Sequence, residues 1–105
     1  MKTETDIQNE IRIALSPYAV VFRGNVGMFY TKDGRQVKTG LPRGFSDLFG
    51  FRKSDGKIFF LEIKTPKGKV SVAQDNFLKE MGKYDVITGV ARSVEEALEI
   101  LNISK

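Results

Sequence analysis

The chain has 105 residues, of which 41% are apolar, and its 17 basic and 13 acidic side chains give a net charge of +4. This length is typical of one domain, so we expect residues 1–105 to form a single domain around one small core. The sequence contains neither Cys nor His. Disulfides, zinc fingers, thiol nucleophiles and Ser-His-Asp triads are therefore excluded, and any catalysis must use carboxylates, Lys, amides, hydroxyls or a bound ion.

The positive charge is concentrated in the middle of the chain. Residues 23–69 carry eleven basic and four acidic side chains, a net charge of +7, whereas residues 1–22 and 70–105 have net charges of −1 and −2. A basic segment of this kind indicates a polyanionic partner such as nucleic acid. A lysine-rich solvated face explains the same counts, and charge alone does not separate the two interpretations.

The sequence carries no signal for a membrane or for secretion. No apolar run approaches the roughly 20 residues that a membrane-spanning helix needs. Residues 1–8 are polar and acidic, unlike a signal peptide. We therefore expect a soluble, intracellular protein with no membrane partner.

Hydrophobic spacing and turn residues predict the elements of the first half. Ile7, Ile11 and Leu15 recur at helical spacing, which predicts an amphipathic helix over 3–15 that Pro17 ends. A buried strand is predicted over 18–23. Short strands over 26–30 and 36–39 flank an Asp-Gly turn, which predicts a polar, exposed hairpin arm.

The second half alternates strands and helices. Strands over 47–52 and 57–64 flank a second Asp-Gly turn and form the predicted central hairpin. Ser71 is the predicted N-cap of a helix that ends near Gly82, a strand follows over 85–92, and Ser93 begins a final helix. A strand between two helices requires a crossover, so it should add in parallel. The predicted class is α/β, with a mixed, mainly antiparallel sheet flanked by helices.

Two carboxylates and one lysine are predicted to converge at the end of the central hairpin. Glu62 and Lys64 are two residues apart and share one face of their strand, and the hairpin can place Asp47 opposite them. Charges in an otherwise apolar strand are costly unless they are paired or bind an ion. Paired carboxylates suit Mg²⁺ or Mn²⁺, and a nearby Lys can orient water, which together describe metal-assisted phosphodiester hydrolysis. An ordinary Glu-Lys pair explains the spacing equally well.

The same residues carry a resemblance to a known family. Gly44-Phe45-Ser46-Asp47-Leu48, the run from Phe60 to Lys69, and Gln74 together resemble the PD-(D/E)XK nuclease signature, and more narrowly the virus-type replication-repair nuclease domain, VRR-NUC. The run from Val90 to Ala97 resembles the closing segment of that family. The resemblance covers nearly the whole chain and implies a restriction-endonuclease-like core. Ser46 departs from the family pattern, which has a turn-shaping Pro there.

The resemblance also implies roles for individual residues. Asp47 and Glu62 would hold Mg²⁺ or Mn²⁺ together with the main-chain carbonyl of Ile63, with no organic cofactor. Lys64 would position the attacking water, and Gln74 would complete the catalytic set, although an exposed helical Gln is the alternative. A further acidic member often comes from the first helix in this superfamily. The candidates are Glu4, Gln8 and Glu10, and for each of them an exposed helix side chain is the preferred interpretation.

Six basic residues are expected to contact DNA phosphates without base specificity: Lys32, Arg35, Lys38, Arg43, Lys67 and Lys69. Stand-alone members of the family resemble Holliday-junction resolvases. The resemblance therefore implies a structure-selective endodeoxyribonuclease that acts on branched or four-way DNA in the cytoplasm, which for a phage-encoded member is the cytoplasm of the host.

A homodimer is expected because one domain of this size offers a DNA footprint of only about 600 to 1,000 Å². Apolar residues within 18–30, or the final helix, are the candidate interface. Two alternatives to the nuclease remain. One is a catalytically silent nucleic-acid-binding module of the same fold, and the other is a protein-interaction domain with an apolar patch of Phe29, Tyr30 and Phe49.

Overall fold

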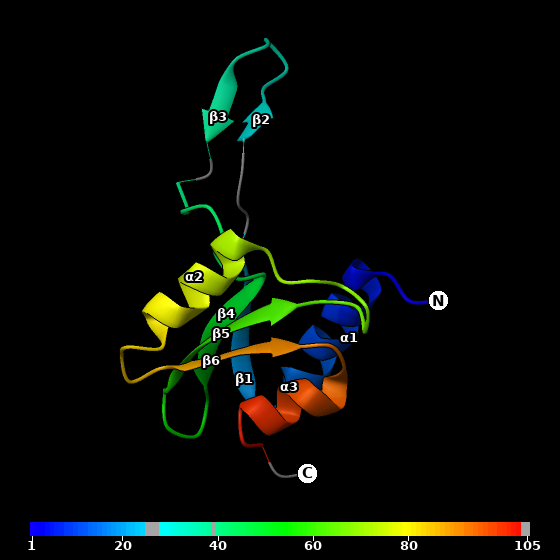
Figure 1. The fold of residues 1–105 in the computed structure, drawn as a ribbon, viewed down its shortest axis with the longest axis vertical. Helices are drawn as coiled ribbons and strands as arrows, with labels where there is room; N and C mark the ends of the chain where they lie inside the picture. Colours follow the sequence, from blue (N-terminus) through cyan, green and yellow to red (C-terminus); the bar gives the residue numbers. More distant parts are fainter. Residues whose placement is uncertain (25–27, 39, 104–105) are drawn as a thin grey trace.

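A computed structural model describes residues 1–24, 28–38 and 40–103 of the chain. Every predicted helix and strand is present in it (Figure 1). The two predicted positions 26–27 and position 39, at the ends of the arm strands, lie outside the described residues. In chain order the elements are α1 (Glu4–Leu15), β1 (Ala19–Arg23), β2 (Met28–Tyr30), β3 (Gln36–Lys38), β4 (Leu48–Arg52), β5 (Ile58–Ile63), α2 (Val72–Met81), β6 (Ile87–Ala91) and α3 (Val94–Ile100).

The main sheet has four strands in the order β1-β4-β5-β6. β1 pairs antiparallel with β4, β4 pairs antiparallel with β5, and β6 adds to β5 in parallel. The predicted mixed, mainly antiparallel sheet is therefore confirmed, because the α2 crossover returns the chain in the same direction as β5. β5 lies inside the sheet, which explains why its sequence is apolar on both faces.

Helices cover both faces of this sheet, and alternation along β5 decides what each face carries (Figure 1). Phe59, Leu61 and Ile63 are completely buried in the main core against α1 and α3. Phe60 faces the other way and packs edge-on against Phe77 of α2, with ring centroids 5.4 Å apart. The same alternation places residue 62 on the α2 side.

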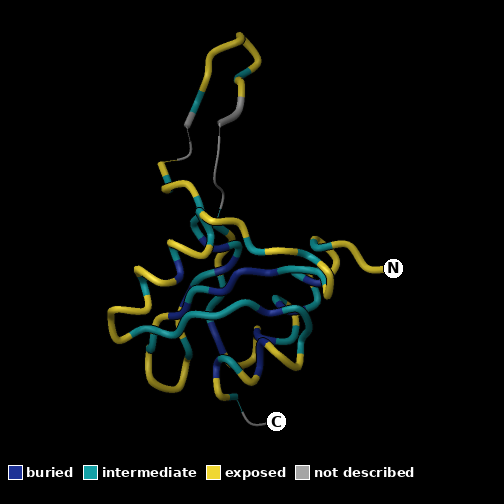
Figure 2. The backbone as a smooth tube through the Cα atoms, viewed as in Figure 1, coloured by how far each residue is buried: buried dark blue, intermediate teal, exposed yellow. Residues whose placement is uncertain are grey.

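The β2–β3 hairpin is a second, two-stranded sheet that projects from this body (Figure 1). Its turn is formed by Gly34, at φ +85°, with Thr31 and Arg35 joined by a main-chain hydrogen bond of 2.8 Å. Its described residues are mostly exposed (Figure 2). The expectation of a polar, exposed arm is confirmed for these residues.

No helix in the described part of the chain is long and apolar enough to cross a membrane. The longest of them, α1, has 12 residues.

Gly44 is a position where only glycine fits. Its φ is +86°, and a Cβ built there would lie 2.2 Å from the carbonyl oxygen of Ala73 in α2. The turn that precedes β4 therefore packs its backbone directly on the first turn of α2.

We expect the G44A variant to be markedly less stable than G56A in urea denaturation. Gly56 has a similar φ of +73° but open space around its Cβ position, so G56A carries only the backbone cost of about 1 to 2 kcal/mol. Gly44→Ala adds overpacking against α2, which typically costs about 1 to 3 kcal/mol more. Equal stability losses in the two variants would contradict the close packing.

Candidate metal centre

Asp47 is positioned by main-chain contacts on both sides of β4. Its carbonyl oxygen accepts a hydrogen bond from the Gly24 N–H at 2.8 Å, at the end of β1. Its carboxylate Oδ2 accepts the N–H of Ile63 in β5, also at 2.8 Å. Since Leu48 pairs with Leu61 in the sheet, Asp47 lies beside Glu62, as predicted from the hairpin.

Ser46, which stands where the family pattern has a Pro, stabilises the turn before Asp47 by a hydrogen bond. The residue is completely buried, and its hydroxyl donates a hydrogen bond of 2.9 Å to the carbonyl oxygen of Leu48. A buried hydroxyl needs such a partner, and here the bond also ties the turn to β4.

Glu62 is completely buried near the end of β5. One carboxylate oxygen, Oε1, accepts a hydrogen bond from the Gln74 side-chain amide at 3.0 Å. The other, Oε2, is the one buried side-chain oxygen or nitrogen without a partner in the described part of the chain. Burial, and then the neighbouring Asp47, raise the pKa of Glu62 to about 9.

Gln74 holds Glu62 from a fixed position because it also belongs to the capping box of α2. Its Oε1 accepts the Ser71 N–H at 2.9 Å, while its own N–H donates to the Ser71 hydroxyl at 3.1 Å. Its side-chain NH₂ group remains free to donate to Glu62. The interpretation of Gln74 as an exposed helix residue is therefore wrong.

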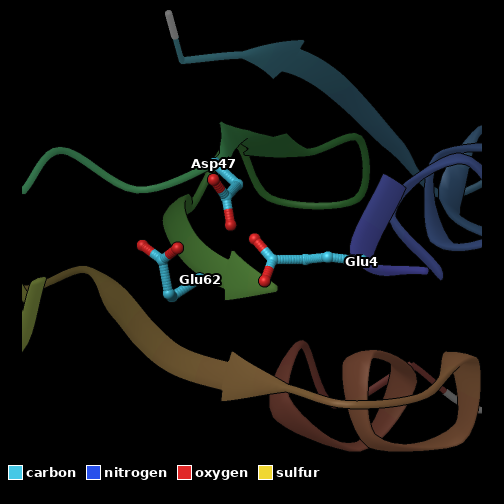
Figure 3. Close-up of side chains that lie close together, drawn as sticks. All are labelled: Glu4, Asp47 and Glu62. Carbon is cyan, nitrogen blue, oxygen red and sulfur yellow. The ribbon is translucent and has the colours of Figure 1, made fainter. Parts of the chain in front are cut away.

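Glu4, the first residue of α1, completes a cluster of three carboxylates with Asp47 and Glu62 (Figure 3). One carboxylate oxygen from each residue lies within 4.8 Å of the other two. The Glu4 side chain is 45% exposed, in keeping with the preferred interpretation, so its part in the site is a proposal that rests on its position beside Asp47 and Glu62. Glu10 instead pairs with Lys2 at 2.8 Å, on the exposed side of α1. Position in the Ile7, Ile11 and Leu15 stripe was the signal that separated them.

Lys64 lies beside the cluster, just beyond the end of β5. Its Nζ is 4.0 Å from Glu4 Oε2, and only 12% of its side chain is exposed. The main-chain N–H of Lys64 donates to the carbonyl oxygen of Ala91 in β6 at 3.1 Å. The predicted convergence of Asp47, Glu62 and Lys64 at one end of the sheet is therefore observed, and the ammonium group approaches Glu4 of α1.

This arrangement fits a hard divalent cation. Three carboxylates close together repel one another, and the partnerless Glu62 oxygen is a buried acceptor that a cation can satisfy. All three donors are oxygens, which suits Mg²⁺ or Mn²⁺. The main-chain carbonyl of Ile63, between Glu62 and Lys64 in the chain, is the further candidate ligand.

The six basic residues are distributed over three places around this centre. Arg43 lines a groove of about 500 Å³ together with Asp47 and Gln74. Lys67 and Lys69 are exposed on the loop after β5. Lys32 and Arg35 are exposed on the arm, where Arg35 pairs with Asp33 at 3.0 Å, and the side chain of Lys38 lies outside the described residues.

The expected apolar patch for a protein partner is not assembled among the described residues. Phe49 packs against Phe22 and Phe45, with ring centroids 5.5 and 5.3 Å away, whereas Tyr30 is 67% exposed on the arm. The side chain of Phe29 lies outside the described residues.

A comparison with protein families gives one match to this chain. The model of the VRR-NUC domain matches residues 24–95, which include Asp47, Glu62, Lys64 and Gln74 but not Glu4. A comparison with curated proteins found no match. The mixed four-stranded sheet flanked by three helices is compatible with a PD-(D/E)XK-like core.

The raised pKa of Glu62 predicts that the metal-free protein loses stability as pH rises from about 4.5 towards 9. Over this range the folded protein keeps the Glu62 proton and the unfolded chain releases it, so the free energy of unfolding falls. At pH 7 the effect amounts to about 3 kcal/mol. The E62Q variant mimics the protonated side chain, so in EDTA at pH 7 it should unfold at higher urea concentration than wild type.

The control for this measurement is E99Q, which makes the same change at an exposed position of α3. Its stability in EDTA at pH 7 should stay within about 0.5 kcal/mol of wild type, as is usual for a surface substitution. An E62Q variant that is less stable than wild type at pH 7 without metal would contradict the assignment of a buried, partnerless carboxylate.

Proposed function

The chain belongs to the VRR-NUC family, which implies a nuclease-type fold, and from this premise we propose that residues 1–105 form one domain acting as a metal-dependent endodeoxyribonuclease. The observation that carries the proposal is the carboxylate cluster of Glu4, Asp47 and Glu62, with a buried oxygen that has no partner and Lys64 at its edge. A cation held by such carboxylates can activate water without any His or Cys.

The residues divide the work according to their contacts. Asp47, Glu62 and the Ile63 carbonyl would hold Mg²⁺ or Mn²⁺, with Glu4 as the additional acidic member. The cation, when bound, supplies charge stabilisation at the phosphate and a more acidic water. Lys64 orients the attacking water and offsets charge that develops on the phosphate oxygens. Gln74 holds Oε1 of Glu62, which leaves the partnerless Oε2 as the oxygen that would be available to the cation.

DNA is the proposed substrate because basic residues lie on several sides of the cluster. Arg43 lines the groove next to Asp47, and Lys67 and Lys69 lie on the loop beyond Lys64. The β2–β3 arm, with Lys32 and Arg35 exposed on it, projects from the body, which lets it follow a second duplex segment (Figure 1). Contacts to phosphates at separate places favour branched or four-way DNA over a single short duplex.

We expect purified protein to cut labelled four-way and flap DNA in Mn²⁺ or Mg²⁺, and to leave them intact in EDTA. D47N, E62Q and K64A should each lower the cleavage rate at least about 100-fold, because each removes a group that acts on the metal or the water. Calorimetry should show that D47N loses Mn²⁺ binding while K64A retains it.

K79A is the matched lysine control, since Lys79 is exposed on α2 and pairs with Asp75 at 2.8 Å. It should cleave like wild type. Binding of DNA without cleavage and without Mn²⁺ binding would sink the nuclease proposal in favour of a silent nucleic-acid-binding module.

A homodimer is proposed to join two such sites, and the edge of β1 is its proposed interface. β1 is one of the two edge strands of the described four-stranded sheet, and edge strands present unpaired main-chain groups to a second chain. Next to it, Ile13 of α1 is 74% exposed and lines a groove of about 570 Å³ with Ala19 and Val21. The final helix is less suitable, because Ala97 and Leu98 are used in the core.

Light scattering after size exclusion should give twice the mass of the chain, and I13D should give the monomer mass with an unchanged circular dichroism spectrum. The dimer should cut four-way DNA faster than linear duplex. A wild-type protein that is monomeric and shows no preference for junctions would overturn this part of the proposal.

A further inference from the structure

The turn after β5 is held by Arg92, the residue that follows the end of β6. Nη1 of Arg92 donates two hydrogen bonds of 2.6 Å, one to the carbonyl oxygen of Thr65 and one to that of Gly68. The N–H of Gly68 also donates to the Thr65 carbonyl at 3.0 Å, which closes the turn. Both hydrogens of a single guanidinium nitrogen thus fix the two ends of the Thr65–Gly68 turn.

Arg92 is itself anchored by the elements on either side of it. Its main-chain N–H donates to Oε1 of Glu96 in α3 at 2.7 Å. The residue before it, Ala91, ends β6 and accepts the N–H of Lys64 at 3.1 Å. The guanidinium therefore extends from a rigid base, whereas Pro66 and Lys67 in the turn are exposed and Pro66 has no N–H to donate.

The held turn begins one residue after Lys64 and carries Lys67, with Lys69 following. Because Thr65 follows Lys64 directly in the chain, movement of Thr65 would also move Lys64. The Nζ of Lys64 lies 4.0 Å from Oε2 of Glu4. The position of the ammonium group at the carboxylate cluster therefore depends on how firmly the turn is fixed.

We propose that Arg92 is a positioning residue that fixes the Thr65–Gly68 turn and thereby holds Lys64 beside the metal centre. The inference rests on the proposed nuclease function for its catalytic consequence. The hydrogen bonds that carry it are independent of that function. Arg92 acts through Lys64 and is not itself placed at the cation.

The test compares wild type with R92A, R92K and the exposed-lysine control K83A. In R92A the Gly68 amide should exchange with deuterium at least tenfold faster, and the single-turnover cleavage rate at saturating DNA should fall at least tenfold. Its Mn²⁺ dissociation constant should stay within twofold of wild type, which shows that the fold and the carboxylates are intact. R92K keeps the charge but not the two directed hydrogens, so its rate should remain below wild type.

The control variant K83A removes one positive charge from an exposed lysine that pairs with Glu80 at 2.9 Å, away from the Arg92 contacts. It should match wild type in the exchange of the Gly68 amide and in the cleavage rate at saturating DNA. The inference is overturned if R92A reaches the wild-type rate at saturating DNA, because Arg92 would then act through charge alone. Unchanged exchange in R92A overturns it as well, and if R92A does not fold, R92K is held to the same two criteria.

The two proposals fail in different ways. A wild-type protein that cleaves no substrate refutes the nuclease proposal and, with it, the catalytic consequence of the Arg92 contacts. If wild type is active but the Arg92 variants keep the wild-type exchange of the Gly68 amide or the wild-type cleavage rate, only the positioning role of Arg92 is refuted.

Discussion

Burial of the Glu62 carboxylate between the sheet and α2 is the constraint on which the rest of the site depends. A carboxylate in this position is costly, and one amide from Gln74 satisfies only one of its two oxygens. Asp47 lies beside it and makes the charged form still less favourable. The fold therefore maintains an energetic cost that a bound cation would remove, and strongly shifted pKa values of this kind are concentrated at functional sites.

The capping box at the start of α2 fixes the side chain of Gln74, which donates to the buried Glu62 carboxylate. Ser71 and Gln74 satisfy each other at the start of the helix, so the amide that supports Glu62 is positioned by secondary structure. Gly44 lets the turn before Asp47 rest directly on the same first turn of α2. The first turn of α2 therefore contacts both Glu62 and the turn that precedes Asp47, whereas Glu4 comes from the start of α1.

Most of the architecture could be predicted because local signals agreed with one another. Caps at Ser71 and Ser93, two Asp-Gly turns and alternation along β5 gave the order of elements and the parallel return of β6. Asp47, Glu62 and Lys64 could be grouped because a hairpin joins them over a short distance in sequence. The stripe of Ile7, Ile11 and Leu15 pointed to Glu4, but its approach to Asp47 crosses more than 40 residues and depends on how α1 packs on the sheet.

The sequence by itself limited the available catalytic groups to carboxylates, Lys, amides, hydroxyls or a bound ion, because the chain has no His or Cys. It also determined the strand and helix pattern, which follows from periodicity and capping within short windows. The tertiary structure alone decided which first-helix residue joins the cluster, that Gln74 serves Glu62 as well as its helix, and that Arg92 holds the turn after Lys64. These are contacts between distant segments, whose geometry depends on how whole elements pack.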